Sequence, residues 1–145
     1  MDSIKHILIA TDGSELSLKA ADFAGTLARA LQASVSIIMV IDEDVVISEA
    51  WGGTSAEDAR RNIESRKSQE EIERTIGALG DLPSEPEKAV EMGHVGDQIC
   101  SFAEENGVDL IVMGSHGRKG IKRALLGSVS YSVVNQAPCA VTIVR

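Results

Sequence analysis

Cysteine is scarce in this chain of 145 residues, and no apolar run is long enough to cross a bilayer. Cys100 and Cys139 show neither metal-ligand spacing nor a C-x-x-C pair, so we expect buried thiols in a reduced, cytoplasmic setting. The first residues contain no signal peptide, and no segment predicts a membrane partner. A hydrophobic share of 43% argues against disorder, and the length predicts a single domain over residues 1–145.

Acidic residues are missing from the last quarter of the chain. The net charge of −8 divides into −13 for residues 1–109 (9 basic, 22 acidic) and +5 for residues 110–145 (5 basic, none acidic). The negative total argues against nucleic acid as a partner. Burial of the strands explains why those parts of the segment lack Asp and Glu. It does not explain the basic cluster of Arg118, Lys119, Lys122 and Arg123. That cluster predicts a small polyanion as ligand.

Apolar runs alternate along the chain with segments of helical periodicity. Strands are predicted over residues 5–10, 34–41, 87–92, 109–113 and 139–145, and helices over 16–32, 54–79, 95–106 and 127–136. The helix at 54–79 has a thin apolar stripe, so we expect it to be the most exposed helix, with its charged residues solvated. The alternation predicts an α/β fold with a mainly parallel sheet and helices on both faces.

Two turns at the carboxyl ends of predicted strands carry polar chemistry. Residues 11–14 (TDGS) follow the first strand, and residues 114–117 (GSHG) follow the fourth. In parallel α/β sheets, ligands bind beyond the carboxyl ends of the strands where the strand order reverses. If the first and fourth strands are neighbours, both turns face one crevice.

The glycine spacing is the most informative pattern. Gly114 and Gly117 are followed, nine residues later, by Gly127 and Ser128 at a predicted helix start. Glycine lets the backbone approach an anion, and helix N-terminal N–H groups point toward it, so the pattern predicts a phosphate cradle. The alternative is turn chemistry alone, with positive φ at the first two glycines and Ser128 as a helix cap.

With these motifs the chain resembles the universal stress protein family over essentially its whole length. The resemblance rests on residues 10–14, 113–117, 125–130 and 138–144. It implies a five-stranded parallel sheet in the order 3-2-1-4-5, Rossmann-like and similar to the adenine nucleotide α-hydrolases. ATP-binding members of the family show G-x2-G-x9-G-(S/T), which this chain matches without a gap. The resemblance therefore implies ATP as cofactor, with Mg²⁺ or Mn²⁺ carried by its phosphates.

The family pattern also implies which residues hold the nucleotide. Asp12 would contact the adenine or the ribose, although the alternative, a capping box over residues 12–15, stabilises a helix start by about 1 kcal/mol without a ligand. Val40 would line the adenine pocket, where ordinary core packing is the alternative. The implied set is Ala10, Thr11, Asp12, Val40, Met113, Gly114, His116, Gly117, Gly127, Ser128, Val129 and Ser130.

Within this set the resemblance assigns different parts to the glycine loop and the helix start. Gly114 and Gly117 would present backbone groups to the ribose and phosphates, and residues 127–130 would hold phosphates through amide and hydroxyl donors. His116 either contacts a phosphate or points to solvent. The basic cluster raises the local potential, and one or two of its side chains reach the γ-phosphate.

Catalytic apparatus is hard to find in the sequence. There is no Walker sequence G-x-x-x-x-G-K-(S/T), no carboxylate close to the glycine loop in sequence, and no catalytic or metal-ligating set. We therefore expect an ATP-binding stress or signalling module with at most slow ATP hydrolysis. The alternatives are an ATP-consuming enzyme, either an ATPase or an adenylating enzyme, and an interaction module that binds no nucleotide.

The last predicted strand bears on assembly. In the implied order, Cys139 to Val144 forms an edge strand that is apolar on both faces and uncharged. An exposed edge of that kind promotes association unless it is covered or paired. The resemblance implies a homodimer that uses this strand.

Overall fold

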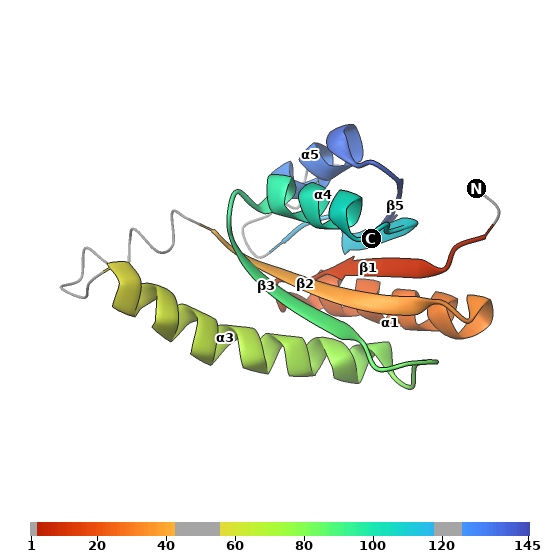
Figure 1. The fold of residues 1–145 in the computed structure, drawn as a ribbon, viewed down its shortest axis with the longest axis horizontal. Helices are drawn as coiled ribbons and strands as arrows, with labels where there is room; N and C mark the ends of the chain where they lie inside the picture. The colour runs from red at the N-terminus through yellow and green to blue at the C-terminus, as the bar shows by residue number, and fades with distance from the viewer. Residues whose placement is uncertain (1–2, 43–55, 118–125) are drawn as a thin grey trace.

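The computed structural model describes residues 3–42, 56–117 and 126–145 (Figure 1). The basic cluster at 118–123 lies outside these residues. The elements are β1 (His6–Ala10), α1 (Glu15–Leu31), β2 (Ser34–Asp42), α3 (Ala56–Leu79), β3 (Glu87–Gly93), α4 (Val95–Glu105), β4 (Leu110–Gly114), α5 (Ser128–Gln136) and β5 (Ala140–Val144). Each predicted strand and helix is confirmed, with its ends within two residues of the prediction.

The five strands form one parallel sheet in the order β3-β2-β1-β4-β5, as the family resemblance implied. From β1 the chain moves outward to β2 and β3, and then returns to place β4 on the other side of β1. Ile7 of β1 pairs with Leu110 of β4 in this register. The strand order therefore reverses between β1 and β4, and their carboxyl ends form the topological switch point.

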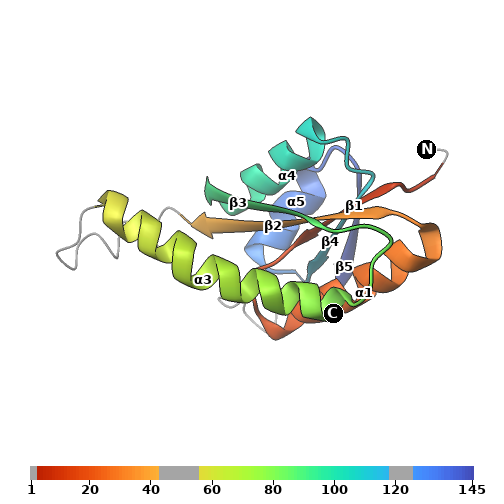
Figure 2. The same cartoon turned by 60° about the horizontal axis from the view of Figure 1, so that its bottom comes forward.

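In the described segments, two helices cover each face of the sheet. Figures 1 and 2 show α4 and α5 together on one face and α1 with α3 on the other. Successive side chains of a strand point to opposite faces, so Ile7 and Ile9 enter the core cluster under α1 and α3. Leu8 and Ala10 enter the second cluster, under α4 and α5. The core is thus two aliphatic layers separated by the sheet.

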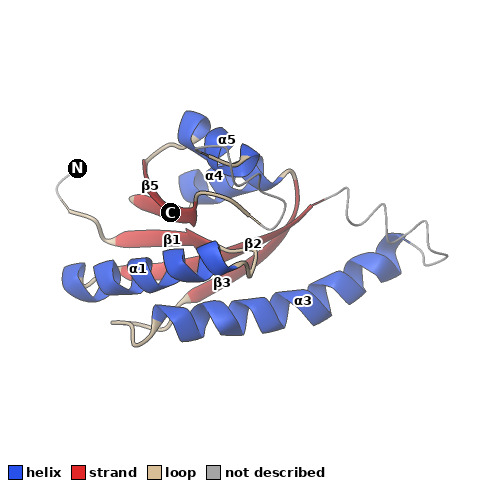
Figure 3. Ribbon diagram, turned by 180° about the vertical axis from the view of Figure 1, so that it is seen from behind, coloured by secondary structure: helices blue, strands red, loops and turns tan. Residues whose placement is uncertain are grey.

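The C-terminal half of α3 is less exposed than its charge pattern predicts. The helix runs along the outside of the sheet beside α1 (Figure 3). Ile72 and Leu79 belong to the core cluster on that face, and Thr75 and Glu71 are buried with them. The expectation of solvated charges is therefore wrong for Glu71, because this part of α3 packs against α1 and the turn that follows β1.

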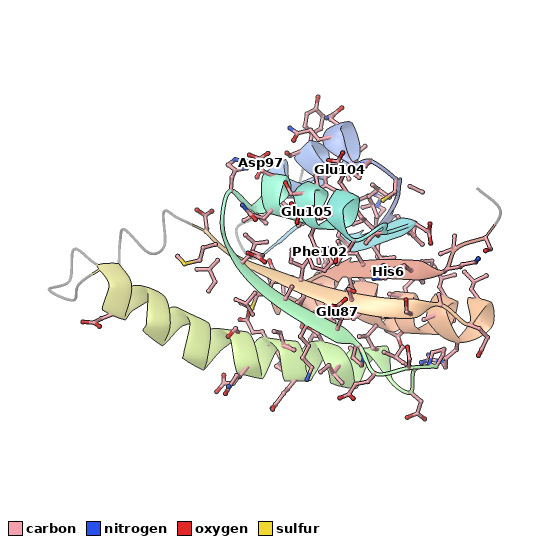
Figure 4. The ribbon with its side chains drawn as sticks, viewed as in Figure 1. His6, Glu87, Asp97, Phe102, Glu104 and Glu105 are labelled. Carbon is pink, nitrogen blue, oxygen red and sulfur yellow. The ribbon has the colours of Figure 1, made fainter. Side chains whose placement is uncertain are left out.

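Polar contacts also join the amino ends of the strands, at the edge opposite the switch point. His6 Nε2 lies 2.7 Å from the Ser36 hydroxyl, which donates to Glu87 at 3.3 Å (His6 and Glu87 are labelled in Figure 4). Asp109 Oδ2 accepts the backbone N–H groups of Lys5 and His6 at 2.9 and 3.0 Å. These two hydrogen bonds, that of Lys5 foremost, hold the pKa of Asp109 below its ordinary value.

The two cysteines are free thiols in the cluster under α4 and α5. Both are half-buried, where the sequence predicted buried side chains. Burial is the main cause that raises the pKa of Cys100 and of Cys139. Neutral thiols are therefore their resting form at neutral pH.

Strand β5 lies at the edge of the sheet, as expected. Val141 and Ile143 pack toward α4 and α5, whereas Val144 packs on the opposite core cluster. Among residues 3–42, 56–117 and 126–145, no strand pairs with its outer side. No helix in the same described segments is long and apolar enough to cross a membrane.

Candidate functional site

The turn that follows β1 and the turn that follows β4 lie against each other at the switch point. A Cβ atom added to Gly117 would lie 2.5 Å from Oδ2 of Asp12. Real side chains essentially never show so short a contact, so the carboxylate of Asp12 rests directly on the backbone of the glycine loop. The prediction that these two turns come together is confirmed.

Asp12 organises its own turn and does not cap α1. Its Oδ1 accepts the backbone N–H of Ser14 at 2.9 Å, which is an Asx turn. The N-cap of α1 is Ser14, whose hydroxyl oxygen accepts the N–H of Ser17 at 3.3 Å. The capping-box alternative over residues 12–15 is therefore wrong, because the cap lies two residues later. Gly13 between them has φ of +78°, a conformation that favours glycine.

Glycine is needed at the motif positions because other atoms come close to the backbone there, and not because the backbone adopts a positive φ. The glycines with positive φ in the described segments are Gly13, Gly80, Gly93 and Gly107, none of them in the motif. A Cβ on Gly114 would lie 3.0 Å from the Leu16 Cβ atom, and one on Gly127 would lie 3.2 Å from the carbonyl oxygen of Ser115. The turn-chemistry alternative for the first two motif glycines is therefore wrong.

Ser115 joins the glycine loop to α5, and sequence reasoning did not single it out. Its carbonyl oxygen accepts the N–H of Gly127 at 2.7 Å and the hydroxyl of Ser130 at 3.1 Å. Its own N–H donates to the carbonyl of Val144 at 2.9 Å. The only sequence feature that pointed to Ser115 was its position inside the GSHG motif. It joins the loop to α5 through its backbone, and a pattern of side chains does not reveal backbone hydrogen bonds.

The first turn of α5 faces the glycine loop with backbone donors. Gly127 is the N-cap and offers no side chain to accept them, so the alternative of Ser128 as the cap is wrong. The first N–H groups of a helix lack partners within the helix, and the first turn of α5 holds no acidic residue. Ser128 is exposed and Val129 half-buried. Ser130 is buried, and its hydroxyl bonds within the protein, to Gly114 O at 2.8 Å and to Ser115 O.

His116 places a buried, unpartnered nitrogen in this cradle. Its Nδ1 lies 3.1 Å from the Ser115 hydroxyl. Its Nε2 is buried and has no hydrogen-bond partner. A buried polar atom without a partner costs about 1–3 kcal/mol, so such an atom needs an explanation. The alternative in which His116 points to solvent does not fit this burial, whereas a ligand acceptor at Nε2 would satisfy the ring.

The apolar members of the expected set come together on one face of the sheet. Ala10, Val40, Met113 and Val129 all belong to or pack against the core cluster under α4 and α5. They come from β1, β2, β4 and α5, and Val40 and Val129 remain partly exposed. Thr11 is buried as well, but its hydroxyl lies on the opposite face of the sheet, in a polar cluster with Thr75 of α3. Ordinary core packing was the alternative role for Val40, and it explains why part of the Val40 side chain is buried.

No group of three or more His, Cys, Asp or Glu side chains that could hold a metal ion is found in the part of the chain that the structure describes. Asp12 is the acidic side chain that meets the glycine loop, and one of its oxygens already serves the Asx turn.

The fold and the site define a class: doubly wound α/β proteins with a glycine-rich backbone cradle at the switch point of a parallel sheet. The model of the universal stress protein family matches residues 3–145. This chain belongs to the universal stress protein family.

Relatives match over nearly their full length. The universal stress protein YxiE of Bacillus subtilis is 35% identical over 144 residues, which cover 96% of this chain and 97% of the relative. The solved structure of MJ0577, a universal stress protein of Methanocaldococcus jannaschii, is 29% identical with a TM-score of 0.82, covering 97% of this chain and 95% of that one. A universal stress protein solved in complex with cAMP is 27% identical with a TM-score of 0.67, covering 99% and 98%.

Proposed function

We propose that this protein binds an adenine nucleotide, with ATP as the preferred ligand, across the turns that follow β1 and β4. The observation that carries the proposal is the buried, unpartnered Nε2 of His116 inside a cradle of glycines and helix N–H groups. The relative solved with cAMP supports an adenine nucleotide as the class of ligand.

Each part of the site has a role in this proposal. The apolar wall of Ala10, Val40 and Met113 accepts the base. Thr11 follows Ala10 in the chain, and its backbone borders the same end of β1. Asp12 faces the ribose or the base from the edge of the glycine loop. Three kinds of group hold the phosphates. They are the backbone of Gly114, Gly117 and Gly127, the first-turn amides of Ser128, Val129 and Ser130, and the Nε2 of His116. Mg²⁺ or Mn²⁺ enters with the phosphates.

The site is better suited to holding the nucleotide than to turning it over. Phosphoryl transfer needs a positioned nucleophile and charge stabilisation at the transferred group. Asp12 is the carboxylate at the loop, and its Oδ1 accepts the Ser14 N–H, so it is tied to the turn. We therefore propose a nucleotide-dependent stress or signalling module whose ATP turnover stays below about 1 s⁻¹, the lower end of ordinary enzyme rates.

Calorimetric titration with ATP, ADP, AMP and cAMP tests the proposal. Wild-type protein is expected to bind ATP most tightly, and Gly127→Val to lose binding while keeping its circular dichroism spectrum. The variant adds a side chain 3.2 Å from the Ser115 carbonyl. The matched control is Gly77→Val on α3, where an added Cβ meets nothing within 4 Å. Absence of heat with all four ligands would leave an interaction module as the better account, and turnover well above the stated limit would favour an ATP-consuming enzyme.

We also propose that the protein is a homodimer formed through the outer edge of β5. The strand is apolar on both faces, and its residues are half-buried or exposed in the single chain. Pairing of two such edges would satisfy their backbone groups and cover the apolar side chains. The cytoplasmic setting expected from the two thiols stays a prediction.

A further inference from the structure

A buried polar cluster connects α3 to the turn that carries Asp12. Thr11, at the start of that turn, and Thr75, in the C-terminal half of α3, are 64 residues apart in sequence, and their hydroxyl oxygens lie 2.9 Å apart. Thr75 is fully buried, and Thr11 and Ser17 of α1 are nearly so. Such a hydroxyl cluster under a binding turn is a feature that the nucleotide proposal does not use.

The direction of each hydroxyl follows from counting protons. Thr75 donates to the Glu71 carbonyl at 2.7 Å, and Ser17 donates to the Ser14 carbonyl at 2.8 Å. Both oxygens are then acceptors for the single proton of Thr11, at 2.9 Å for Thr75 and 3.3 Å for Ser17. The shorter contact is the better hydrogen bond, so Thr11 donates to Thr75.

The Thr11 hydroxyl oxygen also accepts a hydrogen bond from the backbone of the turn. The N–H of Gly13 donates to the Thr11 hydroxyl oxygen at 3.2 Å. Asp12 lies between Thr11 and Gly13. The orientation of the Thr11 hydroxyl therefore fixes the backbone that carries the Asp12 carboxylate. A hydroxyl at Thr75 thus holds the Thr11 proton and leaves the Thr11 lone pairs free to face Gly13.

Helix α3 contacts the same turn a second time. Gly13 has φ of +78°, and a Cβ added there would lie 2.6 Å from the side-chain carboxyl carbon of Glu71. The Glu71 side chain is buried and covers the turn one helical turn before Thr75. The Asp12 turn is therefore held between the glycine loop on one side and α3 on the other.

We propose that Thr75 of α3 is a positioning residue for the Asp12 turn, so that nucleotide affinity and the anchoring of α3 are coupled. The coupling is reciprocal by thermodynamic necessity: a bound nucleotide that fixes Asp12 also strengthens the packing of α3 on the turn. A partner or modification that lifts α3 from the turn would release the nucleotide. The nucleotide half of this inference rests on the proposed function.

The positioning itself is tested without any ligand. Amide hydrogen exchange at Gly13 is compared in wild type, Thr75→Val and Thr75→Ser by NMR. Valine keeps the shape but removes the acceptor, so exchange at Gly13 is expected to rise about two- to tenfold, the range for loss of one neutral hydrogen bond. Serine restores the hydroxyl and is expected to restore slow exchange. Equal exchange in all three proteins overturns the positioning role.

The coupling is then tested by ATP titration of the same proteins. Thr75→Val is expected to bind ATP about two- to tenfold more weakly, and Thr75→Ser to bind like wild type. The control Gly77→Ala adds a methyl group to α3 where nothing lies within 4 Å, and it leaves both the polar cluster and the core packing of the helix intact, so its affinity is expected to stay unchanged. Equal affinity of Thr75→Val and wild type overturns the coupling while leaving nucleotide binding standing. If wild type binds no nucleotide, the proposed function fails, and the exchange result still decides the positioning role.

Discussion

The carboxylate of Asp12 rests on the backbone of Gly117, where even a methyl group would come within 2.5 Å of its Oδ2. The two residues are brought together because β1 and β4 are neighbours in the sheet. The contact joins the turn expected at the nucleoside to the loop expected at the phosphates. The two halves of the proposed site are therefore one surface.

Gly117→Ala should move the Asp12 side chain and weaken ATP binding with little change in the fold, because Gly117 is exposed. Calorimetry on Gly117→Ala, Asp12→Ala and the double variant measures the coupling. If displacement of Asp12 causes the loss, the glycine substitution adds little once Asp12 is alanine. Fully additive losses would mean that Gly117 acts independently of Asp12.

Ser130→Ala should lower the free energy of unfolding by about 0.5–1.5 kcal/mol, since the Ser130 hydroxyl ties α5 to the carbonyls of Gly114 and Ser115. Urea denaturation measures the change. The matched control is Ser101→Ala on the exposed side of α4, which should change stability very little. Equal stability of the two variants would show that the tie contributes nothing measurable.

The sequence predicted the positions of the strands and helices that the structure describes, because apolar periodicity determines them locally. The strand order required the family resemblance, since periodicity along one chain does not say which strands pair. Sequence reasoning went wrong where the outcome depends on contacts made in three dimensions. Ser14 rather than Asp12 caps α1, the motif glycines avoid side-chain overlap rather than adopt positive φ, and Ser115 acts through its backbone.

The buried half of α3 shows the same limit. Its sequence is typical of a solvated helix, yet Thr75 and Glu71 are buried against residues of the β1 turn. Their partners precede them by more than fifty residues, so no local pattern could reveal the contact.

Val141→Lys should convert the proposed dimer to a monomer, because it places a charge in the apolar edge strand β5. Sedimentation velocity measures the change, and circular dichroism checks that the variant is folded. A lysine at the exposed Ala30 of α1 serves as the control and should leave the mass unchanged. A folded Val141→Lys protein that remains dimeric would rule out this edge as the interface.

Asp109 should make stability depend on acid pH. Hydrogen bonds from the N–H groups of Lys5 and His6 lower its folded-state pKa, so it favours the folded state fully above the ordinary Asp pKa of about 3.9. That contribution is lost as the pH falls through the lowered folded-state pKa. Asp109→Asn should therefore lose less stability than wild type between pH 7 and strong acid. Urea midpoints measured across this range check the prediction, and parallel curves would contradict it.

Nucleotide binding at His116 is tested most directly by a ¹⁵N NMR spectrum of its imidazole while ATP is added to nucleotide-free protein. The Nε2 resonance is expected to move in step with the binding heat, because the unpartnered nitrogen gains a phosphate acceptor. A Nε2 resonance that stays fixed at saturating ATP, with or without binding heat, would overturn the proposed site.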